Sequence, residues 1–327
     1  MTTPKVSVLD VMAPEVQAEI LDLAGSDFKV RFAVSNDRSE LLDLVSDCDF
    51  LLIGPEPVPQ ALMERCGRVR LIQKWGVGVD KVDLDTARRM GVPVAIAAGS
   101  NAAPVSELAL ALMMAVNRRM MFADRKIRDG GWPRPVMRGS CFQLDGLTVG
   151  LLGFGAIAQA TARRLTGFDT RVLYHSNRRA DTGIEQALRA QKVPLEQLLA
   201  ESDILSIHVP LNEKTHHMID AKAIAKMKRG AIIVNTARGS VIDEVALYEA
   251  LVSGHLRGAG LDVMEAEPPA ADNPLLKLDN VVFMPHAGGG VFNNVRKVMG
   301  HSLGNMRKVL AGEPLAAADI VVAVRST

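Results

Sequence analysis

Residues 148–158 read Thr-Val-Gly-Leu-Leu-Gly-Phe-Gly-Ala-Ile-Ala, and this stretch decides the fold. Its apolar start predicts a buried β-strand, and the segment from Gly153 to Ala158 matches the pattern G-x-G-x-x-G/A. Gly153 permits a tight turn, Gly155 lets the backbone approach a pyrophosphate, and the small Ala158 lets a helix pack close to the strand. Amide N–H groups at the start of that helix would face the anion. The stretch predicts a dinucleotide-binding turn, with an ordinary βα turn as the alternative.

Short apolar strands alternate with helical segments on both sides of this loop. From the loop onward, strands are predicted at Thr148–Leu152, Thr170–Tyr174, Ile204–Val209, Ala231–Asn235, Gly258–Val263 and Val281–Met284. Before the loop, strands are predicted at Val6–Asp10, Lys29–Val34, Asp49–Ile53, Arg70–Trp75 and Val92–Ala97. Strands separated by helices imply parallel pairing, and six strands are the count of a Rossmann-type sheet. The sequence therefore predicts an α/β protein with two βα series.

Two long helices are expected outside the regular alternation. The first runs from Ala103 to Asp129 and would connect the two series; the second runs from Phe292 to Leu310. The segment Ala103–Met121 is so rich in Ala, Leu and Met that it has more apolar surface than one helix face needs. This surplus predicts a homodimer, and burial of the helix within one chain is the alternative.

Composition excludes several classes of protein. The chain has 327 residues, which suggests roughly two domains, and a net charge of +1, which gives no support to nucleic-acid binding or to an acidic membrane surface. No apolar run is long enough for a membrane span or a signal peptide. Cys48, Cys66 and Cys141 are widely spaced, which argues against disulfides and a cysteine zinc site. We therefore expect a cytoplasmic protein without a metal site.

The residues after the second strand of the Rossmann series bear on the choice of cofactor. An NAD site usually has an Asp or Glu about 20 residues after the first glycine. Here the stretch is Tyr174-His-Ser-Asn-Arg-Arg179, which has no carboxylate. Ser176 and Asn177 can donate hydrogen bonds, and Arg178 and Arg179 can bind a 2′-phosphate. The stretch favours NADP(H), with NAD and a solvent-exposed basic turn as the alternatives.

Three polar clusters each follow a predicted strand of the second series. They contain Arg238, the acidic residues Asp262, Glu265 and Glu267, and His286. Ligands bind at this edge of open α/β sheets. Reduction of a ketone needs a proton donor, a role that His fills near neutral pH, and a carboxylate beside it orients the ring. Arg can hold a substrate carboxylate.

Each of these residues also has a simpler explanation. Arg238 is a surface residue in that case, Glu265 and Glu267 belong to a solvated acidic loop, and His286 is one of seven histidines. The interpretation as one site requires the strands to lie in the predicted order.

The chain resembles the D-isomer-specific 2-hydroxyacid dehydrogenase family over nearly its whole length. Besides the glycine loop, the resemblance rests on six segments in the same order: Trp75–Asp80, Gly99–Glu107, His208–Leu211, Asn235–Gly239, Leu261–Val263 with Glu267-Pro268, and Pro285–Gly288. The stretch Gly288–Asn294 departs from the more polar sequence usual after the family's histidine. This departure concerns the identity of the substrate and leaves the reaction class in place.

The resemblance implies a discontinuous architecture. A Rossmann-type dinucleotide-binding domain, residues 99–287, is inserted in a flavodoxin-like substrate domain made of residues 1–98 and 288–327. The active site is expected in the cleft between these lobes.

The resemblance also implies residue roles. His286 would be the acid/base, Glu267 its partner, and Arg238 the group that binds the substrate's carboxylate and ketone. Backbone amides at Val77 and Gly78 would bind the substrate carboxylate, together with Arg238 and His286. The cofactor-binding residues predicted from the motifs and the resemblance are Gly153, Gly155, Ala156, Ile157, Ser176, Asn177, Arg178, Arg179, Val209, Pro210, Thr215, Thr236, Ala237, Asp262, His286 and Gly288.

Three functions fit these observations. The first is an NADP(H)-dependent reductase of a small 2-keto acid such as glyoxylate or hydroxypyruvate. The second is an NAD-dependent D-2-hydroxyacid dehydrogenase. The third is a cofactor-sensing corepressor without catalytic activity on the same fold.

Overall fold

The computed structural model describes residues 2–323, which divide into two compact units. Unit 1 combines Met1–Asn101 with Gly290–Thr327, and unit 2 is Ala102–Gly289. The predicted boundaries, after residues 98 and 287, differ from these by three residues (101 − 98) and two residues (289 − 287). Residues 1 and 324–327 of the predicted outer domain lie outside the described residues.

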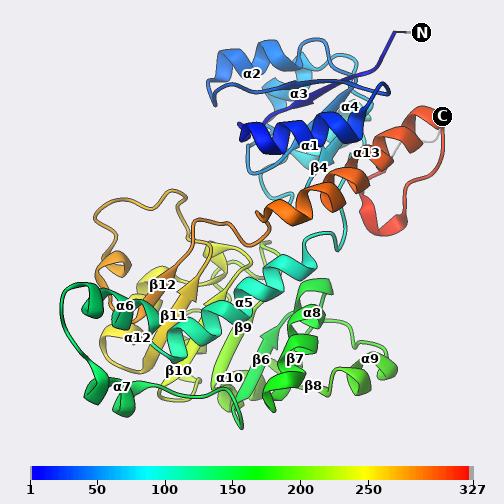
Figure 1. The fold of residues 1–327 in the computed structure, drawn as a ribbon. Coiled ribbons are helices and arrows are strands. Elements are labelled where there is room, and N and C mark those ends of the chain that lie inside the picture. The colour runs from blue at the N-terminus through cyan, green and yellow to red at the C-terminus, as the bar shows by residue number, and fades with distance from the viewer. Residues whose placement is uncertain (1, 324–327) are drawn as a thin grey trace. The chain divides into compact units, whose positions relative to one another are not determined.

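Unit 1 is built on a six-stranded sheet in the order β13-β5-β4-β3-β1-β2, and Figure 1 labels its strand β4. Its strands are β1 (Lys5–Val8), β2 (Lys29–Phe32), β3 (Phe50–Ile53), β4 (Leu71–Lys74), β5 (Val94–Ala95) and β13 (Ile320–Val322). Strands β1 to β5 pair in parallel, and β13 is antiparallel to β5. The order of the parallel strands is the flavodoxin-like one that was expected.

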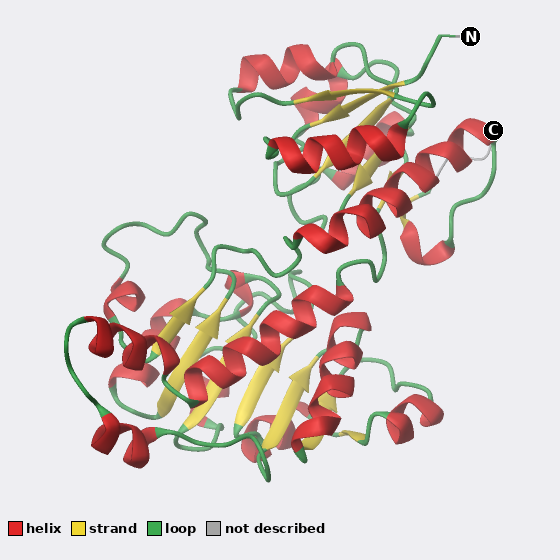
Figure 2. Ribbon diagram, in the orientation of Figure 1, coloured by secondary structure: helices red, strands yellow, loops and turns green. Residues whose placement is uncertain are grey.

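Helices cover both faces of this sheet (Figure 2). They are α1 (Pro14–Ala24), α2 (Arg38–Val45), α3 (Gln60–Arg65), α4 (Leu84–Met90) and α13 (Val295–Ala311), with short 3₁₀ turns η4 (Phe292–Asn294) and η5 (Ala317–Asp319). Helix α13 packs against α1 and β4 (Figure 1). Its Met299 and Leu303 are fully buried in the same core as Ile20 of α1. The C-terminal segment therefore completes a core that the N-terminal segment begins.

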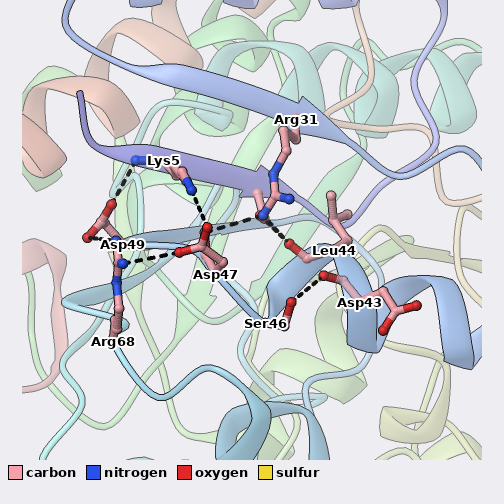
Figure 3. A network of polar contacts seen from close by, with 9 residues as sticks. Lys5, Arg31, Asp43, Leu44, Ser46, Asp47, Asp49 and Arg68 are labelled. Atoms are coloured by element: carbon pink, nitrogen blue, oxygen red, sulfur yellow. Dashed lines mark hydrogen bonds and ion pairs between the residues drawn. The ribbon is translucent and has the colours of Figure 1, made fainter. Parts of the chain in front are cut away.

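Ion pairs tie together the N-terminal ends of the unit 1 strands (Figure 3). The backbone N–H of Lys5 donates to Asp49 at 2.8 Å, and the Lys5 ammonium pairs with Asp47. Arg68 contacts both carboxylates, each at 3.1 Å. Partly exposed pairs contribute about 0–1 kcal/mol each, so the network mainly fixes the loop that enters β3.

Unit 2 contains a seven-stranded sheet in the order β12-β11-β10-β9-β6-β7-β8, with every neighbouring pair parallel (Figure 2). The strands are β6 (Thr148–Leu152), β7 (Arg171–His175), β8 (Ala190–Lys192), β9 (Ile204–Ile207), β10 (Ala231–Asn235), β11 (Leu256–Leu261) and β12 (Val281–Phe283). This order confirms the predicted Rossmann-type sheet, whose order reverses between β6 and β9. The short strand β8 was not predicted, because Ala-Gln-Lys has no β-branched or aromatic residue.

Helices also cover both faces of the unit 2 sheet. They are α5 (Ala102–Asn117), α6 (Met120–Arg128), α7 (Arg134–Ser140), α8 (Ala156–Leu165), α9 (Thr182–Ala187), α10 (Leu195–Glu201), α11 (Ala221–Ala225) and α12 (Glu244–Val252), with 3₁₀ turns η1 (Thr166–Phe168), η2 (Gly239–Val241) and η3 (Pro274–Lys277). Helices α5 and α8 pack in one apolar core, and α10, α11 and α12 pack in the other. Within residues 2–323, no helix has the length and apolar character needed to cross a bilayer.

The prediction of one helix over Ala103–Asp129 was wrong. The helix breaks after Asn117, and Arg119 has a left-handed φ of 48° before α6 begins. Asn117 is 1% exposed; its backbone carbonyl accepts from Phe142 N at 3.0 Å and its side chain accepts from Arg257 at 2.5 Å. These hydrogen bonds to residues distant in the sequence stabilise the break between α5 and α6. Apolar residues of α5 are buried in the core of unit 2, so the alternative of burial within one chain holds for this helix, and the exposed large apolar side chains of Ala103–Met121 are Met120 and Met121.

Candidate active site

The glycine loop joins β6 to α8 at the point where the strand order reverses. Gly153 has a φ of +94°, and a Cβ atom there would lie 2.7 Å from the carbonyl oxygen of His208. Gly155 precedes α8, is exposed, and a Cβ atom there would meet nothing within 4 Å. Ala158 is fully buried in the core. The protein's own packing therefore requires glycine at position 153. Beside Gly155 there is open space at the N-terminal end of α8, where Ala156 and Ile157 also lie, and this space fits a phosphate group.

The predicted basic turn follows β7. Asn177, Arg178 and Arg179 are exposed, and Ser176 is partly buried with its hydroxyl donating to Arg178 O. Arg179 is already paired: its Nε and Nη2 donate to the carboxylate of Glu185 at 2.9–3.1 Å. The turn itself has no carboxylate, as the sequence shows, but α9 places the carboxylate of Glu185 against Arg179 from outside the stretch.

The loop after β9 is held by its own hydrogen bonds. The Thr215 hydroxyl donates to Pro210 O at 2.6 Å and accepts from Asn212 N at 2.9 Å. Val209 and Pro210 are partly buried and exposed, respectively. Of the predicted cofactor residues here, Thr215 thus has an observed role in shaping the loop.

His208 also follows β9, but it is unsuited to proton transfer. Its Nε2 lies 2.9 Å from Ser206 Oγ, and its Nδ1 is buried without a hydrogen-bond partner in the described residues. Burial lowers the pKa of His208 to about 4, so the ring is neutral at pH 7. A neutral ring in this position supports the loop and is no proton donor.

The turn after β10 carries Arg238. Fully buried Asn235 holds this turn from both sides: its side chain accepts from Ala237 N at 3.0 Å and donates to Arg238 O at 2.8 Å. Arg238 Nη1 donates to Ala237 O at 2.6 Å. The hydroxyl of Thr236 is buried and has no hydrogen-bond partner in residues 2–323. An unsatisfied hydroxyl at the sheet edge that bears the glycine loop fits a bound polar ligand.

Asp262, directly after β11, organises the loop that carries His286. Its two carboxylate oxygens accept from Ala287 N at 2.8 Å and Gly288 N at 3.0 Å, and its carbonyl accepts from His286 N at 2.7 Å. A Cβ atom on Gly288 would lie 2.8 Å from the carboxylate, so glycine is needed there. Burial raises the pKa of Asp262. Its predicted contact with the nicotinamide stays a prediction.

His286 and Glu267 form a direct pair. His286 Nδ1 lies 2.9 Å from Glu267 Oε2, and 39% of the His286 side chain is exposed. Glu267 in turn accepts from Met264 N at 3.3 Å. Because Nδ1 faces the carboxylate, Nε2 is the ring nitrogen left to face a reactant. The predicted pairing of these two residues is present in the structure.

Gly239 couples the turn of Arg238 to the loop of Glu267. A Cβ atom on Gly239 would lie only 1.9 Å from the backbone carbon of Met264. The next residue, Glu265, pairs with His217 at 2.5 Å. Neither contact was predicted. A glycine after an arginine does not indicate close packing against Met264, and the sequence gives no sign that His217 pairs with Glu265, 48 residues away.

Val77 and Gly78 follow β4 at the carboxyl edge of the unit 1 sheet. Val77 is 37% exposed. They belong to a different unit from Arg238 and His286, so a shared substrate site stays a prediction.

A glycine-rich turn at the switch point of a parallel sheet, with a histidine–carboxylate pair at the same edge, is typical of dinucleotide-dependent dehydrogenases. Residues 110–288 match the family described as "D-isomer specific 2-hydroxyacid dehydrogenase, NAD binding domain". The chain is 43% identical over 254 residues to the glyoxylate reductase of Korarchaeum cryptofilum, covering 76% of each chain. It is 39% identical over 265 residues to the hydroxypyruvate reductase of Thermotoga maritima, covering 80% of this chain and 85% of that one.

Solved structures agree with this assignment. A Thermus thermophilus protein matches with a TM-score of 0.85 and 33% identity, covering 97% of this chain and 100% of that one. An NAD-dependent formate dehydrogenase from Staphylococcus aureus, in complex with NAD, matches with a TM-score of 0.86 and 26% identity, covering 98% and 99%. The chain belongs to the D-isomer-specific 2-hydroxyacid dehydrogenase family. It is an oxidoreductase with a nicotinamide dinucleotide as cofactor.

The two loop glycines should respond differently to replacement by alanine. Gly153→Ala forces a left-handed φ on a side chain and a clash with His208, so we expect a loss of at least about 1–2 kcal/mol of stability without cofactor. Gly155→Ala meets no protein atom, so its stability should equal the wild type while NADPH and NADH bind about tenfold more weakly. Urea unfolding and fluorescence titration measure the two effects. Wild-type cofactor affinity in Gly155→Ala would contradict the phosphate assignment.

Proposed function

We propose that this enzyme reduces small 2-keto acids of the glyoxylate and hydroxypyruvate type to D-2-hydroxy acids, with NADPH as cofactor. The observation that carries the proposal is the Glu267–His286 pair at the edge of the sheet that also bears the glycine loop. The names of the two relatives, a glyoxylate reductase and a hydroxypyruvate reductase, support this substrate class.

His286 is the proton donor in this proposal. Its Nδ1–H donates to Glu267, and this hydrogen bond orients the ring. His286 Nε2 then gives its proton to the ketone oxygen as the alcohol forms, and in the reverse direction takes it back. The bound nicotinamide supplies or accepts the hydride.

Arg238 binds the substrate carboxylate and polarises the ketone in the same proposal. A guanidinium group suits this role because it makes two parallel hydrogen bonds to a carboxylate. Gly239 and the side chain of Asn235 hold the Arg238 backbone in place. The family resemblance implies the same role for the backbone amides of Val77 and Gly78.

The preference for NADPH rests on the residues after β7. Ser176, Asn177, Arg178 and Arg179 include no carboxylate to bind a free 2′-hydroxyl, and Arg178 is exposed with no hydrogen bond from its guanidinium in residues 2–323. A guanidinium contact to a phosphate is worth roughly 1.5–3 kcal/mol, which is about tenfold or more in affinity.

A panel of keto acids assayed with both cofactors tests the function. We expect glyoxylate and hydroxypyruvate to be reduced, with kcat/KM for NADPH at least about tenfold above that for NADH. Replacing both Arg178 and Arg179 by Ala should remove most of this preference and change NADH kinetics little; Lys192→Ala, which removes a cation from the neighbouring strand β8, is the control. Equal use of both cofactors would contradict the NADPH assignment, and no turnover of any keto acid would favour the corepressor alternative.

His286→Ala should lower kcat by about 10² to 10⁴ while leaving NADPH affinity nearly unchanged, because it removes only the proton donor. His208→Ala provides a matched control, since that ring is held neutral and should support stability rather than turnover. Steady-state kinetics and fluorescence titration measure both quantities. A loss of less than about threefold in kcat for His286→Ala would remove this residue from the role.

We also propose that the enzyme is a cytoplasmic homodimer. The three cysteines are free, as expected in a reducing compartment. Helices α6 and α7 have no buried residue, and the segment displays exposed Met121, Ile127, Trp132, Val136 and Phe142, with Trp132 76% exposed. An apolar surface of this kind supports contact with a second copy.

Light scattering at micromolar concentration should give about 70 kDa, twice 35.2 kDa. Trp132→Glu should give the monomer, because a charge would be placed in the contact. Val245→Glu, at a site in α12 that is 68% exposed, should stay dimeric. A wild-type mass of about 35 kDa would refute the dimer.

A further inference from the structure

Glu185 is a buried carboxylate directly behind the basic turn. It lies in α9 and is 7% exposed, although its neighbours Ile184 and Gln186 are exposed. Its carboxylate accepts three side-chain donors: Tyr174 Oη at 2.5 Å, Arg179 Nη2 at 2.9 Å and Arg179 Nε at 3.1 Å. These donors lower the pKa of Glu185, Arg179 more than Tyr174, so the group is ionised at neutral pH.

The pairing uses only one edge of the Arg179 guanidinium. Nε–H and one N–H of Nη2 face Glu185, while the N–H groups of Nη1 and the second N–H of Nη2 point away from it. The Arg179 side chain is 69% exposed, whereas that of Glu185 is 8% exposed. The guanidinium is therefore held from the protein side and presents its other edge to solvent.

Tyr174 holds the backbone of the same turn in place, and it connects this turn to the glycine loop. Its hydroxyl accepts from Ala180 N at 3.0 Å while donating to Glu185. Its ring is fully buried and stacks on Phe154 of the glycine loop, with ring centres 3.8 Å apart and planes at 15°. The turn after β7 and the predicted pyrophosphate loop thus share one rigid support.

We infer that Glu185 is a positioning residue for recognition of the cofactor's 2′-phosphate, holding the Arg179 guanidinium so that its outer edge meets that group. This inference rests on the proposed preference for NADPH. A free arginine side chain loses much rotamer entropy when it binds a phosphate, and an arginine already held by Glu185 loses less.

A purely electrostatic role would have the opposite sign. If Glu185 acted only through its charge, it would repel a phosphate dianion, and its removal would strengthen NADPH binding. If it acts by positioning, its removal weakens NADPH binding and leaves NADH unchanged. The two roles are therefore distinguished by whether removal of Glu185 raises or lowers the ratio of kcat/KM for NADPH to that for NADH.

Glu185→Gln is the direct test, because glutamine keeps the size of the side chain and an acceptor for Tyr174. We expect the ratio of kcat/KM for NADPH to that for NADH to fall at least about fivefold, through KM for NADPH and not through kcat. Asp181→Asn is the matched control: it removes one negative charge from the same segment, where Asp181 caps α9 by accepting from Gly183 N at 2.8 Å. Asparagine caps helices equally well, so this variant should keep the wild-type ratio.

A double variant shows whether Glu185 acts through Arg179. In an Arg179→Ala background, Glu185→Gln should change the cofactor ratio by less than about twofold. In calorimetric titrations, Glu185→Gln should weaken the binding of adenosine 2′,5′-bisphosphate and leave the binding of AMP unchanged. If Glu185→Gln does not fold, Tyr174→Phe provides a second test. This variant removes the acceptor of Ala180 N and should also lower the ratio of kcat/KM for NADPH to that for NADH.

An unchanged or increased cofactor ratio in Glu185→Gln overturns the inference, as does an equal loss for NADPH and NADH. Failure of the proposed function gives a different result. In that case the wild type itself uses NADH as well as NADPH, before any variant is compared.

Discussion

Parallel pairing of β6 with β9, and from there through β10, β11 and β12, is the constraint on which the active site depends. Because these strands run in one direction, the loops that follow them all leave the same edge of the sheet. Pairing alone does not place a side chain. Asp262 does so by binding three backbone N–H groups through its carboxylate and carbonyl, and this fixes the His286 loop within reach of Glu267.

Local signals made the sheet predictable, whereas the pairing of His286 with Glu267 was implied by the family resemblance. The strands Thr148–Leu152 and Ala231–Asn235 have the predicted bounds, because apolar runs ending at a glycine or a polar cluster mark both ends of a strand. The break after Asn117 was not predictable, since Asn117 is fixed by Arg257, which lies 140 residues further along the chain. The pairing of Arg179 with Glu185 was not predicted either, because Glu185 lies beyond the position where a cofactor-binding carboxylate is expected.

Buried carboxylates serve two different purposes in unit 2. Asp262 binds backbone N–H groups in a site where burial raises its pKa, and it orders a loop. Glu185 binds a cation and a phenol that lower its pKa, and it orders side chains. A buried charge is costly unless its hydrogen bonds are satisfied, and each of these groups has several donors. In both cases the carboxylate positions other groups that would contact a ligand, and the carboxylate itself does not contact that ligand.

The packing of α13 against α1 has a consequence for the order in which the chain folds on the ribosome. Unit 2 is continuous in sequence, so its whole sheet is available once residue 289 has left the exit tunnel. The core of unit 1 lacks Met299 and Leu303 until α13, which follows unit 2 in the sequence, has been synthesised. Domains form as units when all of their parts are present. The inserted unit therefore completes its fold first, and residues 2–101, although made before it, are covered after it.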